Sequence, residues 1–197
     1  PTGRVGLMSV VFTPVGIRDI LHLPLNELTN RYVSLEEALG KEGKDMEEQM
    51  MNLAGFDERV DSLETFLLGR LQRRNEFENN RMRMVMTRLL QGRGMFNVEQ
   101  LAGYACLSKK QFERVFAAYV GLMPKQYLRV IRFLYAVEFR NRMPEVDLAT
   151  LAFHTGYYDA AHLANEIKAL TGHTSSTLFQ LMCFSEDVES IEWFLGA

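Results

Sequence analysis

An internal repeat restricts the fold of this chain more than any other feature of its sequence. The segment LAGYACLSKKQFERVFAAYVG, residues 101–121, realigns with LAFHTGYYDAAHLANEIKALTG, residues 151–172. The offset is 50 residues at the paired Leu-Ala dipeptides and 51 at the closing glycines, so the second copy has one inserted residue in its turn. Such a repeat, with apolar residues at helical spacing, predicts two copies of a helix, a tight turn and a second helix.

Each turn is expected to need a residue with positive φ. Ala102 and Ala152 are small enough to let the second helix of each unit cross closely, and Cys106 and Gly156 follow four residues later. Glycine adopts the left-handed conformation freely, whereas Cys106 would be strained there by about 1 kcal/mol.

A long helix is predicted between the two copies. Pro124 suits the first position of a helix, and Met143-Pro144 should stop it after about Arg142. Such a helix of about 19 residues would be roughly 28 Å long. This length is of the order of one DNA turn, about 34 Å, the separation expected of two recognition helices.

Charge is distributed unevenly along the 197 residues. Residues 81–176 carry 13 Lys and Arg against 7 Asp and Glu, whereas residues 1–80 have a net charge of −5 and residues 177–197 of −4. A basic block between acidic ends predicts one module that binds a polyanion and another that does not. No apolar run approaches the roughly 18 residues of a membrane span, and no signal peptide is visible. The widely spaced Cys106 and Cys183 indicate reduced thiols in a cytoplasmic protein.

The N-terminal part predicts less regular structure. Its first apolar run, VGLMSVVF at residues 5–12, is expected to form a strand without earlier partners, which suggests a fragment or a lost domain half. Ser34 and Glu37 fit a capping box, followed by a loop at KEGKD, residues 41–45. A helix from about Asp57 to Arg74 could form a dimer seam or pack on its own domain. Residues 81–91 predict another helix whose apolar face contains Met82, Val85, Met86, Leu89 and Leu90.

The doubled unit resembles the C-terminal DNA-binding domain of the AraC/XylS family of bacterial transcription regulators. The first unit of that family resembles residues 101–128, and its linker resembles YLRVIRFLYA, residues 127–136. The signature of the second unit, G-F-x-[DS]-x-S-x-F-x-x-x-F-K and then G-x-x-P, stands here as GYYDAAHLANEIKALTGHTS. Ala161 replaces the usual Ser, and Ser175 the usual Pro. The resemblance covers about residues 81–180 and implies an all-helical domain that binds double-stranded DNA.

The resemblance also implies which residues face DNA. The first recognition helix would present Lys110, Glu113 and Arg114 to base edges, with Arg114 the best candidate for a bidentate contact to guanine. Lys109, near the helix start, would meet phosphate, as would Lys125 or Arg129. The full set of DNA-binding candidates is Ser108, Lys109, Lys110, Glu113, Arg114, Lys125, Arg129, Ala160, Ala161, Ala164, Asn165 and Lys168.

The second recognition helix is expected to contribute less. Its base-facing positions would hold three alanines and Asn165, and residues 145–176 carry one Lys against four acids. Alanine can touch a thymine methyl group, but only Asn165 could read adenine by hydrogen bonds. We therefore expect the first unit to supply most of the affinity and specificity and the second unit mainly to dock.

Alternative functions remain open at this point. An enzyme has little support, because His22, His154, His162 and His173 are scattered and no catalytic motif is present. Neither a metal nor another cofactor is expected. His154 and His162 could form a metal pair, and Cys106 could be a redox sensor, although packed histidines and a small buried cysteine are the simpler interpretations. A second hypothesis is a helical protein-interaction module whose helix-turn-helix scaffold has lost DNA binding.

The sequence thus predicts a mainly α fold with two helix-turn-helix units on a long linker helix, preceded by a partial α+β region. The expected divisions are a sensor-domain remnant, often cupin-like in the family (1–56), a linker or dimerisation helix (57–80), the DNA-binding domain (81–180) and an acidic-apolar tail (181–197). The predicted function is sequence-specific regulation of bacterial promoters. Expected partners are duplex DNA, RNA polymerase, a second copy of the chain and an unidentified small-molecule effector. The tail is expected to pack back on the domain or to be a docking peptide for the sensor domain or polymerase.

Overall fold

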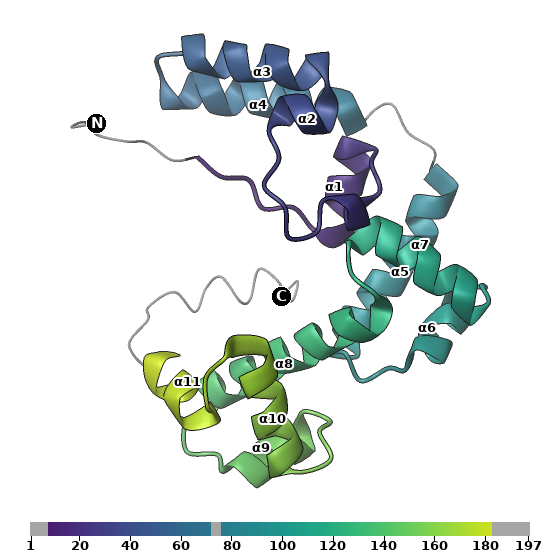
Figure 1. Cartoon of the computed structure of the whole chain (residues 1–197), viewed down its shortest axis with the longest axis vertical. Coiled ribbons are helices and arrows are strands. Elements are labelled where there is room, and N and C mark those ends of the chain that lie inside the picture. Colours follow the sequence, from purple (N-terminus) through teal and green to yellow (C-terminus); the bar gives the residue numbers. More distant parts are fainter. Residues whose placement is uncertain (1–7, 72–75, 183–197) are drawn as a thin grey trace. The chain divides into compact units, whose positions relative to one another are not determined.

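The computed structural model describes residues 8–71 and 76–182, and these ranges contain helices and turns but no β-strand (Figure 1). The chain divides into two compact units. The N-terminal unit comprises residues 1–79 with 118–121, and the C-terminal unit comprises residues 80–117 and 122–197. No helix in the described part of the chain is long and apolar enough to cross a membrane.

The strand expected at residues 5–12 is wrong where it can be examined. Residues 8–13 have no strand pairing, and residues 5–7 lie outside the described ranges. The predicted partial α+β region is therefore corrected to a helical one over residues 8–71. The physical reason is that an apolar run makes a strand only where a neighbouring strand accepts its hydrogen bonds, and none of the described residues provides one.

The N-terminal unit is built from short helices. They are α1 (Pro14–Leu21), a 3₁₀ turn (Leu25–Glu27), α2 (Leu35–Leu39), α3 (Lys41–Asn52) and α4 (Phe56–Leu71). The predicted capping box is confirmed, because Ser34 Oγ accepts from the Glu37 amide and the Glu37 carboxylate accepts from the Ser34 amide, both at 3.0 Å. The loop predicted at residues 41–45 is wrong, since this segment opens α3.

Two contacts explain how these helices pack. Gly43 is buried where α3 crosses α2, and a Cβ atom there would lie only 2.0 Å from the Leu35 carbonyl oxygen. Arg70 of α4 donates to the Ile20 carbonyl at 2.6 Å and pairs with Glu42. A single guanidinium thus connects α4 with the end of α1 and the start of α3.

The C-terminal unit begins with α5 (Glu76–Gln91), whose first residues belong to the N-terminal unit. Its predicted apolar face is confirmed: Met82, Val85, Met86 and Leu89 are buried, and Leu90 is half-buried. The following helices are α6 (Val98–Tyr104), α7 (Lys109–Val120), α8 (Pro124–Arg142), α9 (Leu148–His154), α10 (Ala160–Thr171) and α11 (Ser175–Met182). The bounds predicted for the linker helix, α8, are confirmed.

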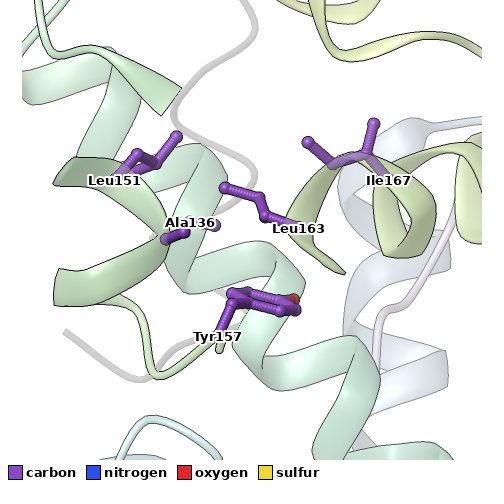
Figure 2. Packing of buried hydrophobic residues seen from close by; sticks show 6 residues of the cluster. Ala136, Leu151, Tyr157, Leu163 and Ile167 are labelled. Atoms are coloured by element: carbon purple, nitrogen blue, oxygen red, sulfur yellow. The ribbon is translucent and has the colours of Figure 1, made fainter. Parts of the chain in front are cut away.

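Helix α8 takes part in the packing of both repeated units. Tyr127, near its start, packs edge-on against Phe116 of α7 with 5.7 Å between ring centroids. Ala136, nine residues later, joins a buried cluster with Leu151 and Ala152 of α9, Tyr157 of the turn, and Leu163 and Ile167 of α10 (Figure 2). Figure 1 shows α9, α10 and α11 gathered around the C-terminal part of α8.

The loop between α5 and α6 also connects the two repeats. Gly94 is buried at φ 72°, and a Cβ atom there would lie 2.8 Å from the Leu128 carbonyl oxygen of α8. Arg93 hydrogen-bonds Tyr135 of α8 and lies over its ring at 4.2 Å from the centroid. A Cβ atom on Gly156, in the turn of the second unit, would lie 3.2 Å from Met95. This loop therefore contacts the linker helix and the second turn together.

Candidate nucleic-acid interface

The two repeated units share the same pattern of buried residues. The equivalent pairs are Leu101 with Leu151, Ala102 with Ala152, Phe112 with Leu163 and Phe116 with Ile167, and every member is at most 3% exposed. The helices also match in length, with seven residues each in α6 and α9 and twelve each in α7 and α10. The predicted duplication of a helix, a turn and a helix is confirmed.

The turns confirm the predicted left-handed residues. Cys106 has φ 53° and Gly156 has φ 75°. In both units the amide three residues after the end of the first helix donates to the carbonyl oxygen of the small alanine: Leu107 N to Ala102 O at 3.0 Å, and Tyr157 N to Ala152 O at 2.9 Å. This is the 6→1 hydrogen bond of a Schellman ending. Since the offset is still 50 at Tyr157 and reaches 51 at the caps Ser108 and Asp159, the inserted residue is Tyr158.

The outer face of α7 is cationic and open to solvent. Lys110 and Arg114, one helical turn apart, are both exposed, and Glu113 between them is half-buried. Over residues 8–71 and 76–182, neither Lys110 nor Arg114 has an ion-pair partner. The opposite face buries Phe112 and Phe116 completely. Core packing therefore fixes the helix while two positive side chains remain available for a ligand.

Two further candidates of the first unit have local partners. Lys109 forms an exposed ion pair with Glu99 of α6, 2.7 Å between Nζ and Oε1, and their hydrogen bond raises the pKa of Lys109 and lowers the pKa of Glu99. Ser108 caps α7: its amide donates to Gln111 Oε1 at 3.2 Å, and its Oγ accepts from the Gln111 amide at 3.4 Å. Lys125, the second residue of α8, is exposed.

The outer face of α10 carries little charge. Ala161, Asn165 and Lys168 are exposed at i, i+4 and i+7, so they form one stripe, while Ala160 and Ala164 are half-buried beside it. Asp159 caps the helix by accepting from the His162 amide at 2.7 Å. The exposed stripe corresponds position by position to Lys110, Arg114 and Ala117 of α7.

Arg129 has a protein partner that the sequence did not reveal. Its Nε and Nη2 atoms donate to the two carboxylate oxygens of Glu166 of α10 at 2.8 and 3.0 Å. These hydrogen bonds and the charge of Glu166 raise the pKa of Arg129. The expected phosphate contact of Arg129 thus competes with a bidentate ion pair inside the domain.

Two exposed aromatic side chains near the second turn were missed. Tyr158 is 92% exposed and Phe153, near the end of α9, is 81% exposed. The sequence contained a clue to Tyr158, because this residue is the one inserted into the second copy of the repeat. Large apolar side chains this exposed are candidates for contact with a partner molecule.

The other candidate chemistries gain no support from the geometry. His154 stacks on Phe139 with 5.2 Å between centroids, and His162 packs edge-on against Tyr157. The described ranges contain no group of three or more side chains suited to hold a metal ion. Cys106 is exposed, so its interpretation as a small buried filler is wrong; Cys183 and the tail from residue 183 lie outside the described residues.

Comparison with known proteins agrees with this geometry. Residues 101–180, the two repeated units with α8 between them, match the family described as "Helix-turn-helix domain". The chain is 26% identical over 136 residues to an uncharacterized HTH-type transcriptional regulator of Haemophilus influenzae; the alignment covers 62% of this chain and 45% of that protein, so the chain spans less than half the length of this relative. No solved structure matches the chain. The repeated units, their shared turns and the matched family together show that residues 101–180 are a helix-turn-helix domain of the AraC type.

Proposed function

We propose that this chain regulates transcription by binding specific promoter sequences in bacterial DNA, with α7 and α10 placed in successive turns of the major groove. The observation that carries the proposal is the outer face of α7, where Lys110 and Arg114 are exposed and without an ion-pair partner among the described residues. Arginine on a recognition helix can donate two hydrogen bonds to guanine O6 and N7.

The proposal assigns unequal roles to the two units. α7 reads bases through Arg114, Lys110 and Glu113, and Lys125 and Lys109 contact phosphates. α10 docks through its exposed stripe, in which Asn165 is the one side chain able to form paired hydrogen bonds with adenine. The acidic balance of residues 145–176 supports this division, because phosphate contacts require cations.

Selection of bound sequences from a random duplex pool by the full chain tests the proposal. Arg114→Ala should weaken binding of the selected duplex about 5- to 150-fold, the equivalent of about 1–3 kcal/mol. Asn165→Ala should weaken it less, and Lys44→Ala, an exposed lysine of α3, should leave it unchanged. Equal losses for the first two variants would contradict the unequal roles.

The second candidate function is a protein-interaction module without DNA binding, which the alanine-rich, weakly charged face of α10 favours. The salt dependence of duplex binding separates the two. A DNA-binding domain loses affinity steeply as salt rises, because each neutralised phosphate releases counterions. Absence of measurable duplex binding at low salt would support the interaction module.

Response to a small-molecule effector, contact with RNA polymerase and homodimerisation complete the proposal. Dimerisation has some support in α4, where Phe56 and Leu68 are more than half exposed on a helix that buries none of its residues. Sedimentation equilibrium of the chain and of the Phe56→Ser and Leu68→Ser variants tests this part. A monomeric chain at micromolar concentration would refute it.

A further inference from the structure

Helix α10 contacts α8 through two interactions of different kinds. The first is apolar: Ala136 of α8, with Phe133 and Phe139 packed beside it, lies in the buried cluster that contains Leu163 and Ile167 of α10 (Figure 2). The second is the bidentate ion pair between Arg129 of α8 and Glu166 of α10. Arg129 and Ala136 are seven residues apart, two helical turns, and therefore lie on the same face of α8, about 10 Å from each other along the helix axis.

Apolar packing centred on one small residue does not by itself fix the direction of a helix. Helices with small residues at their contact pack at more than one crossing angle, and the commonest classes differ by about 70°. A second contact two turns away restricts the rotation. The guanidinium and the carboxylate are suited to this task, since two parallel hydrogen bonds form over a narrow range of orientations.

The neighbouring residues support the same arrangement. Arg132, on the same face of α8 as Arg129, lies over the ring of Tyr157 with 5.8 Å to the centroid. Tyr157 is buried in the turn that precedes α10, and its burial raises its pKa to about 12, so it stays uncharged at neutral pH. Arg129 and Glu166 are 35% and 18% exposed, so water screens their interaction only in part.

We propose that Arg129 and Glu166 are positioning residues that fix α10 on the linker helix and thereby set the spacing of the two half-sites that α7 and α10 read together. This inference rests on the proposed function. The pair contributes mainly to geometry, because ion pairs with this much exposure add little to folding stability. Fixing the register of one packed helix against another is the best-attested use of partly buried ion pairs.

The full chain and four variants test this inference. Arg129→Glu and Glu166→Arg each place two like charges together, the double variant Arg129→Glu/Glu166→Arg restores an ion pair with reversed polarity, and Glu138→Gln removes an ion pair confined to α8 as the matched control. The probes are the duplex selected by the wild-type chain, duplexes with either half scrambled, and duplexes with one base pair inserted between the halves.

Each single variant should bind the selected duplex about 10- to 100-fold more weakly, because rigidly linked modules gain at least this factor from simultaneous engagement. Affinity for the α7 half-site alone should not change, the penalty for the inserted base pair should shrink, and the double variant should recover both properties. A loss on the α7 half-site that the double variant does not recover would identify Arg129 as a phosphate contact and overturn the inference. Wild-type behaviour of the single variants would overturn it as well.

Hydrogen exchange provides a readout that does not require DNA. In the single variants the amides of α10 should exchange at least several-fold faster, with those of α7 unchanged, and the double variant should restore protection. If the wild-type chain bound no duplex but showed this pattern, the proposed function would fail while the positioning of α10 by the ion pair would stand. Unchanged exchange in α10 would refute the positioning role itself.

Discussion

The residue with positive φ is a cysteine in the first turn and a glycine in the second, and replacing each of them tests the structural equivalence of the two turns. Cys106 has φ 53° and an exposed side chain, whereas Gly156 has φ 75° and a closest side-chain neighbour in Met95. A non-glycine residue in this conformation costs about 1–2 kcal/mol. Glycine costs about 0.5–1 kcal/mol through its freedom in the unfolded chain.

The strain energy and the glycine entropy together predict changes of opposite sign in the free energy of unfolding for the two substitutions. Cys106→Gly removes the strain and adds the glycine entropy, so it should raise the free energy of unfolding by up to about 1.5 kcal/mol. Gly156→Ala adds the strain, removes the smaller entropic cost of glycine, and also places a Cβ 3.2 Å from Met95, which must shift by a few tenths of an ångström. We expect a loss of about 1–2 kcal/mol for this variant.

Thermal unfolding measures both changes, with hydrogen exchange in α6–α7 and α9–α10 assigning the transition to its unit. A change of 1 kcal/mol corresponds to about 4–8 °C in a cooperative unit of 60–100 residues. Gly103→Ala is the matched control, because Gly103 has ordinary φ and open space around it, and this variant should be stabilising. Destabilisation by Cys106→Gly, or neutrality of Gly156→Ala, would refute the strain argument.

Three other outcomes follow from the geometry. Gly94→Ala should destabilise the C-terminal unit by about 2 kcal/mol or more in chemical denaturation, since φ is 72° and the new Cβ would meet the α8 backbone at 2.8 Å; an unchanged midpoint would contradict the close approach. Phe116→Ala and Ile167→Ala, at equivalent and fully buried positions, should each cost about 2–5 kcal/mol in the same assay, and a cost below about 1 kcal/mol at either would argue against a shared core pattern. Asp147, which caps α9, should have a pKa below its usual value in carboxyl-detected NMR, because the Thr150 amide and hydroxyl and the Ala149 amide donate to its carboxylate. The stabilisation from this cap is complete above the unfolded-state pKa and is lost as pH falls through the lower folded-state pKa. An unshifted pKa would show that the cap is absent in solution.

The sequence predicts those parts of the structure that local stereochemistry decides. Pro124 and Pro144 restrict the backbone on either side of α8, so the bounds of this helix could be predicted from two residues. The left-handed turn residues followed from the alignment of Cys106 with Gly156. Predicting these features does not require knowing which distant segments of the chain are in contact.

Other features depend on contacts between distant residues, and the sequence did not reveal them. Gly43 reads locally as part of a loop, yet its missing side chain is what lets α3 cross α2 closely. Arg129 reads as one more cation in a basic block, but its partner Glu166 is 37 residues away. The candidate site was therefore predictable at the outer face of α7, where burial of Phe112 and Phe116 orients the helix, and less so where α8 meets α10.

The role of α8 in both buried clusters also bears on how the duplicated domain can be divided. Tyr127 packs against Phe116 of the first repeat, and Ala136 belongs to the buried cluster of the second. A fragment that ends before α8 would remove Tyr127 from Phe116 of the first repeat, and a fragment that starts at α8 would leave the Tyr127 ring without this partner. Division on either side of α8 removes a packing partner from at least one repeat, so we expect the two copies to be stable only when both are kept with α8.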